Sequence, residues 1–392
     1  MRPLAGITVV SVEQAVAAPF ATRQLADLGA RVIKIERPGT GDFARHYDRT
    51  VKGMSSHFVW LNRSKESLTL DLGHDTGKEV LWQLLDRADV FVQNLGPGAM
   101  DRLGFGLDAL HVRQPRLIAC QVSGYGADGP YHDKKAYDLL VQAEVGLLSI
   151  TGTEDQAVKC GVPIADIAAG MYAYSGILSS LFLRERTGRG AMLEVSLIDA
   201  LADWMGYPAY YTGYGGTAPT RSGARHAAIA PYGPFTTGDR HTLLLAIQND
   251  REWEAFCGVV LEMPEMATNP TFRTNADRVE HREALERQID QCLNTVNAEE
   301  VRRRLERARI AYAEMRTMEE FLAHPQLAAR RRWAEMDSPV GRLWTLRPPV
   351  EMDGMNAEFG PVPDIGQHTD AILTELGYDG TQITELREQG IV

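Results

Sequence analysis

The sequence predicts an α/β fold built on a parallel, doubly wound sheet. Through the first 125 residues, short runs of β-branched apolar residues alternate with helix-like segments, and the alternation recurs after residue 75. Strands joined in this way pair in parallel through right-handed crossovers. Ligands of such sheets bind at the carboxyl ends of the strands. The loops after residues 13, 36, 94 and 123 are therefore the first candidates for a site.

The individual elements of this first part follow from local patterns. The strands are predicted at 7–12 (ITVVSV), 31–36 (RVIKIE), 90–94 (VFVQN) and 117–123 (LIACQVS). Pro19 opens a helical pattern that ends near Gly29, a favoured C-terminal cap, and a second helix covers 76–89. Together these segments form repeated strand–helix–strand units.

A long helix is predicted from residue 166 to Thr187-Gly188. One apolar stripe repeats at spacings of four and three, comprising Ile167, Met171, Tyr174, Leu178 and Leu181. A strand at 192–196 and a helix at 197–206 follow it. This completes the segment expected to form the first part of a large domain, 1–206.

The amino-acid composition changes at residues 207–225. They are rich in Gly, Tyr, Thr and Pro, which indicates a linker or a ligand-facing loop. A strand pair and charged helices at 250–262 and 276–308 then predict a smaller α+β domain over 226–325. Short strands and a helix around 369–377 occupy the last segment, 326–392.

Composition restricts the class of protein. The chain has 392 residues with 41 Lys+Arg and 52 Asp+Glu, a net charge of −11, which argues against sequence-independent nucleic-acid binding. No segment approaches the length of a membrane-spanning helix, and the N-terminal apolar run is too short for a signal peptide. Four widely separated cysteines without CxxC predict neither a disulfide framework nor structural zinc. We expect a cytoplasmic protein with no membrane partner.

Several enzyme classes are disfavoured by missing motifs. The first strand is followed by EQAVAAPFA rather than GxGxxG, and no GxxxxGK[ST], GxSxG or HExxH occurs. Nicotinamide-dependent dehydrogenation and P-loop phosphoryl transfer are thus disfavoured. His46, His57 and His74 lack ligand spacing, so no metal site is predicted.

Three features of the sequence are candidates for binding or catalysis, and each can also be explained by an ordinary structural role. Arg37 and the helix N-terminus at Pro19–Thr22 can bind an anion, or Arg37 is a solvated surface residue. Asp166 either caps the long helix or is a carboxylate that attacks an activated acyl group, with small neighbours leaving room for substrate. The loop GYGADGPYHDKK, with Lys135, Tyr137 and Asp138 at its end, either covers a ligand or crosses the surface.

Motifs throughout the chain resemble the class III CoA-transferase family, also called CaiB/BaiF. They are PLAGITVV…APFATRQLADLGARVIKIERPGTGD, LNRSKESLTLDL, NLGPGAMDRLG, VSGYGADGP, AYDLLVQAEVGLLSITG, GVPIADIAAGMYAYSGILSSLFLRERTGRG and IGQHTD. The family includes formyl-CoA transferase and succinyl-CoA-dependent dicarboxylate transferases, and α-methylacyl-CoA racemases share its fold. The resemblance implies an interlocked homodimer with a Rossmann-like large domain from both termini (1–206 and 326–392). CoA is then a substrate at the sheet edge, with no tightly bound cofactor.

The resemblance also implies roles for individual residues. Asp166 corresponds to the nucleophile, which forms an aspartyl–acyl anhydride and then an aspartyl–CoA thioester. Positions corresponding to the CoA site are Gln14, Ala15, Val16, Arg37, Leu70, Asn94, Arg102, Leu103, Lys135, Tyr137 and Asp138. Arg221, Arg225 and His226, in RSGARHAAIAPYGPF, resemble a stretch of transferases for C4–C6 dicarboxylates and either hold a distal carboxylate or are ordinary linker charges.

Two departures from family patterns narrow the activity. Only Gly215-Gly216 is present where formyl-CoA transferase has four successive glycines, which disfavours oxalate and formyl-CoA. Ala136 precedes Tyr137 and the nearest histidine is His132, which disfavours a racemase. We expect transfer from succinyl-CoA or a similar donor to malate, mesaconate, citramalate or itaconate. A 2-methylacyl-CoA racemase and a CoA-binding relative without turnover are the alternatives.

Overall fold

The computed structural model describes residues 2–354 and 359–392 and contains two compact units. The first unit comprises Met1–Gly146, Cys160–Tyr207 and Leu327–Val392, and the second comprises Leu147–Lys159 and Pro208–Gln326. The short segment Leu147–Lys159 belongs with the second unit, which no pattern in the sequence indicates. Within the expected linker 207–225, α10 covers Gly206–Gly215, so this part is helical rather than a loop.

The first unit is built on a six-stranded parallel sheet, which confirms the predicted fold class. Its order is β3-β2-β1-β4-β5-β6, so the chain first extends the sheet on one side of β1 and then on the other. The strands are β1 (Thr8–Val12), β2 (Arg31–Glu36), β3 (Lys65–Thr69), β4 (Val90–Gln93), β5 (Ile118–Ser123) and β6 (Met192–Ser196). The order reverses between β1 and β4, where open α/β sheets bind ligands.

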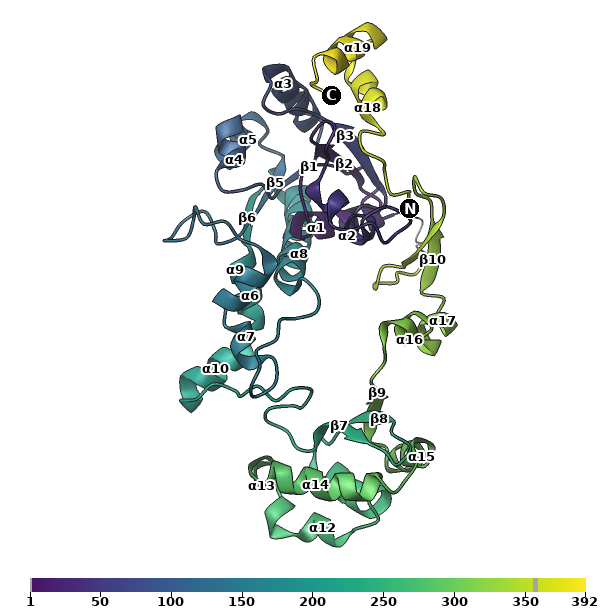
Figure 1. Ribbon diagram of the computed structural model, residues 1–392. Helices are drawn as coiled ribbons and strands as arrows, with labels where there is room; N and C mark the ends of the chain where they lie inside the picture. The colour runs from purple at the N-terminus through teal and green to yellow at the C-terminus, as the bar shows by residue number, and fades with distance from the viewer. Residues whose placement is uncertain (1, 355–358) are drawn as a thin grey trace. The chain divides into compact units, whose positions relative to one another are not determined.

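Helices and a hairpin complete this unit (Figure 1). The helices are η1 (Phe43–His46), α1 (Ala17–Asp27), α2 (Ser56–Leu61), α3 (Asp75–Leu85), α4 (Ala99–Leu103), α5 (Leu107–Arg113), α6 (Asp138–Glu144), α8 (Ile164–Thr187), α9 (Leu197–Trp204), α18 (Thr369–Leu376) and α19 (Gly380–Glu388). The hairpin pairs β10 (Trp333–Met336) with β11 (Leu343–Leu346) in antiparallel register. The C-terminal segment thus belongs to the same unit as the N-terminus.

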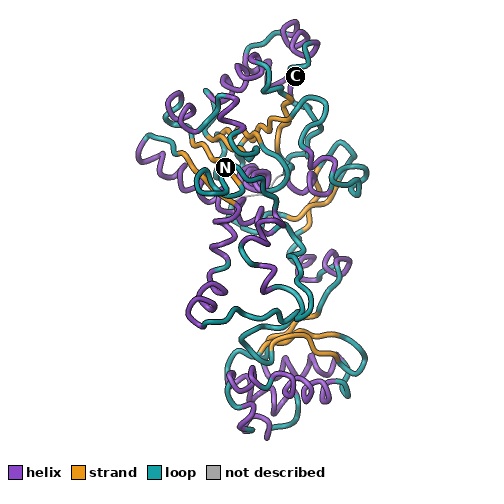
Figure 2. Tube along the Cα trace, turned by 60° about the vertical axis from the view of Figure 1, so that its left-hand side comes forward, coloured by secondary structure: helices purple, strands orange, loops and turns teal. Residues whose placement is uncertain are grey.

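The second unit is a smaller α+β structure, whose three strands appear in orange in Figure 2. Strands β7 (Tyr232–Thr236), β8 (Thr242–Ala246) and β9 (Ala311–Glu314) form an antiparallel sheet in that order. Its helices are α7 (Leu147–Ile150), α11 (Asp250–Ala255), the π-helix η2 (Phe256–Val260), α12 (Glu265–Thr268), η3 (Pro270–Phe272), α13 (Asn275–Glu280), α14 (Arg282–Leu293), α15 (Ala298–Ala308) and α16 (Met318–Leu322). Helices α10 and α17 (Pro325–Ala329) each cross the boundary between the units. Trp253, Phe256 and Ile289 are among its fully buried core residues.

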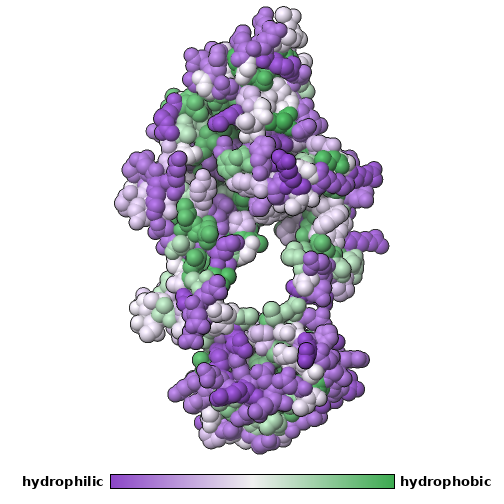
Figure 3. Space-filling model, viewed as in Figure 1, coloured by the Kyte–Doolittle hydropathy of each residue, from purple (hydrophilic) through white to green (hydrophobic). Residues whose placement is uncertain are grey.

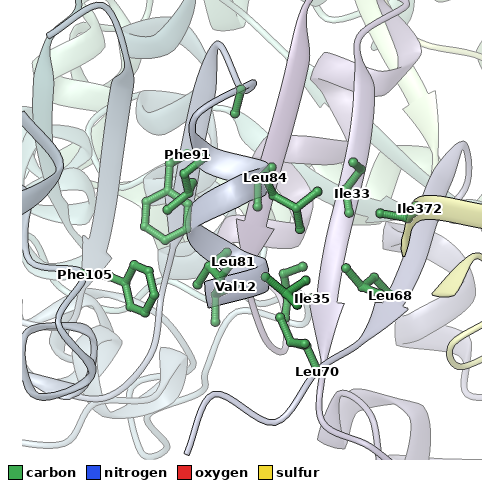
Figure 4. Packing of buried hydrophobic residues seen from close by; sticks show 14 of the residues in the cluster. Val12, Ile33, Ile35, Leu68, Leu70, Leu81, Leu84, Phe91, Phe105 and Ile372 are labelled. Carbon is green, nitrogen blue, oxygen red and sulfur yellow. The ribbon is translucent and has the colours of Figure 1, made fainter. Parts of the chain in front are cut away.

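The first unit has a continuous apolar core on one side of the sheet. Val12, Ile35 and Leu68 from the strands pack with Leu81 of α3 and Ile372 of α18 (Figure 4). Because the first strands are buried on both faces, they are nearly continuous runs of apolar residues, as parallel sheets require. This is why strand positions could be predicted almost residue by residue.

The first half of helix α8 packs through small residues, and the predicted apolar stripe is buried only in part. Leu181 of that stripe is buried, whereas Met171 is exposed. The buried residues of the first half are Ala165, Ala168, Ala169, Gly170 and Ala173. A Cβ at position 170 would lie 2.7 Å from the carbonyl oxygen of Ala17, at the start of α1. The glycine therefore permits a close approach of α1 and α8.

Replacement of Gly170 by alanine tests this close approach. At Gly170 the added methyl meets backbone, whereas at Gly176 on the same helix its nearest neighbour is Leu193 Cδ1 at 3.6 Å. We expect Gly170→Ala to lower the free energy of unfolding by about 1–3 kcal/mol. Gly176→Ala, the matched control, should raise it by up to about 1 kcal/mol through helix propensity. Urea unfolding of both variants is the measurement, and equal stabilities would show that the helices are not in tight contact.

Candidate active site

The turn between β1 and α1 is tied to the end of β4 by a reciprocal pair of hydrogen bonds. The backbone N–H of Gln14 donates to Asn94 Oδ1, and Asn94 Nδ2 donates to the carbonyl oxygen of Gln14, both at 2.8 Å. This pair lies where the strand order reverses. Two of the predicted CoA-site residues therefore meet at the switch point of the sheet.

Ala15 adopts a left-handed conformation in the same turn. Its φ is +59°, unusual for a residue with a side chain, and its N–H donates to Asp42 Oδ1 at 3.1 Å. Such a conformation costs on the order of 1 kcal/mol and persists only where the surroundings impose it. Val16 follows, buried, and α1 then begins at Ala17, with no side-chain cap among the described residues.

A buried network of charges supports this turn. Lys34 Nζ lies 2.7 Å from Asp42 Oδ2 and 3.6 Å from Glu13 Oε1, and Lys65 Nζ lies 2.6 Å from Glu13 Oε1. Thr22 Oγ1 donates to the second oxygen of Glu13 at 2.6 Å. Burial alone would raise the pKa of Glu13, but Lys65 and Lys34 outweigh it and hold that pKa below its usual value.

A second buried ion pair completes the network. Arg45 binds both oxygens of Glu36, at 2.8 and 2.7 Å, while Ser67 and the N–H of Asp42 donate to the same carboxylate. Three cations, Lys34, Lys65 and Arg45, thus balance three carboxylates, Glu13, Glu36 and Asp42. No spacing rule in the sequence indicates this network.

Asp166 lies in the first turn of α8, as its third residue, and is half-buried. The structure rejects the interpretation that it caps the helix, because Asp138 Oδ1 accepts the N–H groups of Ala165 and of Asp166 itself, at 2.7 and 3.2 Å. One helical turn later, Gly170 contacts Ala17. Asp166 therefore lies on the side of α8 that approaches the β1–α1 turn.

Burial raises the pKa of Asp166 to about 7, and the neighbouring Asp138 carboxylate adds to the rise. A carboxyl group with such a pKa titrates in the neutral range and is a stronger nucleophile, when ionised, than an ordinary aspartate. The site therefore presents, beside the switch point of the sheet, a carboxyl group that changes its charge near neutral pH.

Tyr47 also belongs to this site and was not predicted. Burial raises its pKa to about 12, and the charges of Asp42 and Asp166, with Tyr137, add to the rise. Its ring is about half exposed and packs edge-on against His57 at 5.4 Å between centroids. Tyr47 is a single tyrosine outside any recognised motif, so no pattern in the sequence indicates that it belongs to the site.

The other predicted CoA-site residues lie at the same carboxyl edge but differ in accessibility. Arg37, Arg102, Lys135 and Tyr137 are exposed, and Arg102 Nη2 donates to the Pro97 carbonyl at 3.2 Å. Leu103 packs against the core. Leu70 is only 2% exposed and belongs to the core, so it presents no surface for adenine packing.

The predicted substrate residues belong to the second unit and already have partners. Arg221 donates to the carbonyls of Thr153 and Glu154, at 2.8 and 2.7 Å, and Arg225 pairs with Glu286 at 2.6 Å. His226 stacks on Tyr232. Both arginines therefore hold the unit together, which explains why a cation-rich sequence stretch need not be a substrate site.

Within the described residues, no helix is long and apolar enough to cross a membrane. No cluster of three or more potential metal ligands occurs among the same residues.

Comparisons with known proteins place these features in context. Residues 4–369 match the family described as CoA-transferase family III. Human succinyl-CoA:glutarate CoA-transferase is 32% identical, covering 100% of this chain and 90% of the relative. An acetyl-CoA:oxalate CoA-transferase of Acetobacter aceti is 36% identical over 84% of each chain. The crystal structure of a CaiB/BaiF family protein from Brucella suis superposes with a TM-score of 0.83 at 30% identity, covering 96% of this chain and 99% of that one.

The raised pKa of Asp166 makes fold stability depend on pH. In the unfolded chain its pKa is about 4, so ionisation costs stability progressively between about pH 4 and pH 7, and the full cost is present above pH 7. We expect Asp166→Asn to raise the free energy of unfolding by about 2 kcal/mol at pH 8 and much less at pH 4. Urea unfolding at both pH values is the measurement. Asp128→Asn, an exposed loop control, should change neither value, and a gain for Asp166→Asn that is independent of pH would contradict the raised pKa.

Proposed function

The chain belongs to CoA-transferase family III, and on that premise we propose that it transfers CoA from succinyl-CoA, or a similar short dicarboxylyl-CoA, to a small dicarboxylic acid. The observation that carries the proposal is the carboxylate of Asp166, which lies in the first turn of α8 beside the β1–α1 turn and titrates near neutral pH. Covalent catalysis by a carboxylate requires this combination of partial burial and ionisation.

In the proposed reaction, Asp166 attacks the donor thioester. Its carboxylate oxygen bonds to the acyl carbon, the C–S bond breaks, and CoA leaves as the thiolate with the electron pair. The thiolate then attacks the aspartyl carbonyl of the resulting anhydride, which releases the donor acid as its carboxylate and forms an aspartyl–CoA thioester. An acceptor carboxylate reverses both steps and regenerates Asp166. One thioester is exchanged for another, so the energy of the first is conserved in the second.

For the CoA site, we propose that the exposed cations at the carboxyl edge bind the phosphates of CoA. Arg37 follows β2 and Arg102 lies on α4, while Lys135 precedes α6. The Arg37 guanidinium forms no hydrogen bond or ion pair with the described residues, although the backbone carbonyl of Arg37 accepts the N–H of Gly41, so the side chain is available to a ligand. The net charge of the chain is −11, but these cations make the carboxyl edge locally positive. A locally positive surface attracts a polyanion even in an acidic protein.

The acceptor is a dicarboxylic acid of two to six carbons in this proposal. The human relative is named for glutarate, which supports the C4–C6 acids expected from the sequence. The Acetobacter relative is named for oxalate, so oxalate is included among the acceptors to be tested, although the short glycine run Gly215-Gly216 disfavours it. Because Arg221 and Arg225 have internal partners, we do not assign the distal carboxylate to them.

An interlocked homodimer in the cytoplasm belongs to the proposal. Large apolar side chains on α6, α8 and α9 of the first unit are exposed, namely Leu139, Leu140, Met171, Phe182, Leu183 and Trp204. Apolar atoms gather over the region of α6 and α9 in Figure 3. An apolar surface of this kind is typical of a subunit interface and supports a second copy of the chain as its partner.

Asp166→Ala tests the nucleophile. We expect transfer to fall by at least about 10³-fold, because alanine lacks the carboxylate that forms the anhydride, while CoA binding by calorimetry stays within a few-fold of wild type. A screen of succinyl-CoA and acetyl-CoA against C2–C6 acids, read by mass spectrometry, measures activity. Hydroxylamine should trap wild-type Asp166 as a hydroxamate. Substantial transfer by the variant, or exchange of the α-proton with solvent deuterium without a free acid, would contradict the proposal.

Arg37→Ala tests the CoA site. Loss of a phosphate contact should raise KM for the CoA thioester by about tenfold with kcat changed by less than about threefold. Arg87→Ala is the matched control, because Arg87 is also exposed but precedes β4 and so lies at the opposite edge of the sheet. An unchanged KM with a collapsed kcat would place the nucleotide site elsewhere.

A further inference from the structure

We propose that Asp138 is a positioning residue for this reaction. Its carboxylate accepts hydrogen bonds from the first backbone N–H groups of α8, so these groups do not bind the Asp166 carboxylate, which stays nucleophilic. This inference rests on the function proposed above. It gives Asp138 a different role from the contact with CoA expected from sequence resemblance.

Asp138, which belongs to α6, caps the N-terminus of another helix, α8. Asp138 begins α6, and its Oδ1 accepts the N–H of Ala165 at 2.7 Å and that of Asp166 at 3.2 Å. Its Oδ2 accepts from Gln142 Nε2 at 2.7 Å, and Gln142 is fully buried. Gln142 Oε1 in turn accepts the N–H of Cys160, in the segment that leads to α8. The carboxylate is therefore fixed on both sides.

This arrangement removes the stabilisation that a helix N-terminus normally gives to a first-turn carboxylate. Free N–H groups and the helix dipole would favour the ionised form of Asp166 and make it a weaker base. Here the nearest donors already bind Asp138, and within the described residues the Asp166 side chain forms no hydrogen bond or ion pair. The phenol of Tyr47 also lies close enough to Asp166 for the carboxylate charge to raise the pKa of that tyrosine.

The two carboxylates therefore have different roles. Asp138 receives three hydrogen bonds, whereas Asp166 receives none from the described residues and faces the negative charge of its neighbour. A carboxylate that is poorly stabilised when ionised has more to gain by forming a bond to an acyl carbon. Asp138 thus favours attack by Asp166 without touching the substrate.

Asp138→Asn separates the charge from the cap. Asparagine retains an oxygen that accepts the two N–H groups but removes the negative charge and, with it, the acceptor for Gln142 Nε2, so the pKa of Asp166 should fall. We expect the acidic limb of single-turnover Asp166–CoA thioester formation, near pH 7 in wild type, to shift downward by about one pH unit. The rate above the limb should fall by a few-fold, because the carboxylate is less basic. Intact-protein mass spectrometry after mixing with succinyl-CoA at a series of pH values measures the covalent adduct directly.

Two further variants define the outcome. Asp379→Asn is the matched control, because Asp379 also caps a helix, α19, by accepting the N–H of Gln382 at 2.9 Å. In this variant the acidic limb of thioester formation should lie at the same pH as in wild type. Gln142→Leu removes the donor to Asp138 Oδ2, which leaves that charge less neutralised and should shift the limb upward. An unchanged limb in either folded variant, Asp138→Asn or Gln142→Leu, would overturn the positioning role. Absence of any adduct in wild type with all donors would instead overturn the proposed function.

Discussion

The buried charge network beneath the β1–α1 turn is the constraint on which the rest of the site depends. Six ionised groups are held at the carboxyl edge of the sheet, and each carboxylate has a cation and further hydrogen-bond donors. Removing one member of such a network leaves an uncompensated buried charge, which costs several kcal/mol. The network therefore imposes one geometry on the turn, including the left-handed Ala15 that binds Asp42.

The sheet could be predicted from sequence because parallel strands are buried on both faces. The predicted strands 31–36 and 192–196 coincide with β2 and β6, and those predicted at 7–12, 90–94 and 117–123 differ from β1, β4 and β5 by one residue at an end. The boundary between the units was harder to predict. Residues 147–159 join the second unit through contacts such as that of Arg221 with Thr153, and no local pattern reports a contact between segments 68 residues apart.

Helix α8 shows why a correct helix can be given the wrong buried face. The apolar stripe predicted burial through large side chains, and Leu181 is indeed buried, but Met171 is exposed and the buried residues in the first half of the helix are alanines and Gly170. Hydrophobic periodicity assumes that larger side chains face the core. In α8 the close approach of α1 selects small residues instead, and large apolar residues such as Phe182 face outward.

The partners of a side chain are what the sequence predicted least well. Sequence resemblance predicts Asp166 as the nucleophile, and the structure places this residue half-buried in the first turn of α8. The sequence could not show that Asp138, rather than Asp166, supplies the cap, since both are acidic residues near a helix start. For the same reason Arg225 resembled a substrate residue until Glu286 was seen to pair with it.

The hydrogen bonds between Asn94 and Gln14 have a consequence for recognition. They occupy both backbone polar groups of Gln14, so a molecule arriving at the junction of β1 and β4 meets a residue whose main chain is already paired. This part of the junction is assembled before a ligand arrives and loses little freedom when one binds. At Gln14, contact with a ligand is therefore left to the side chain.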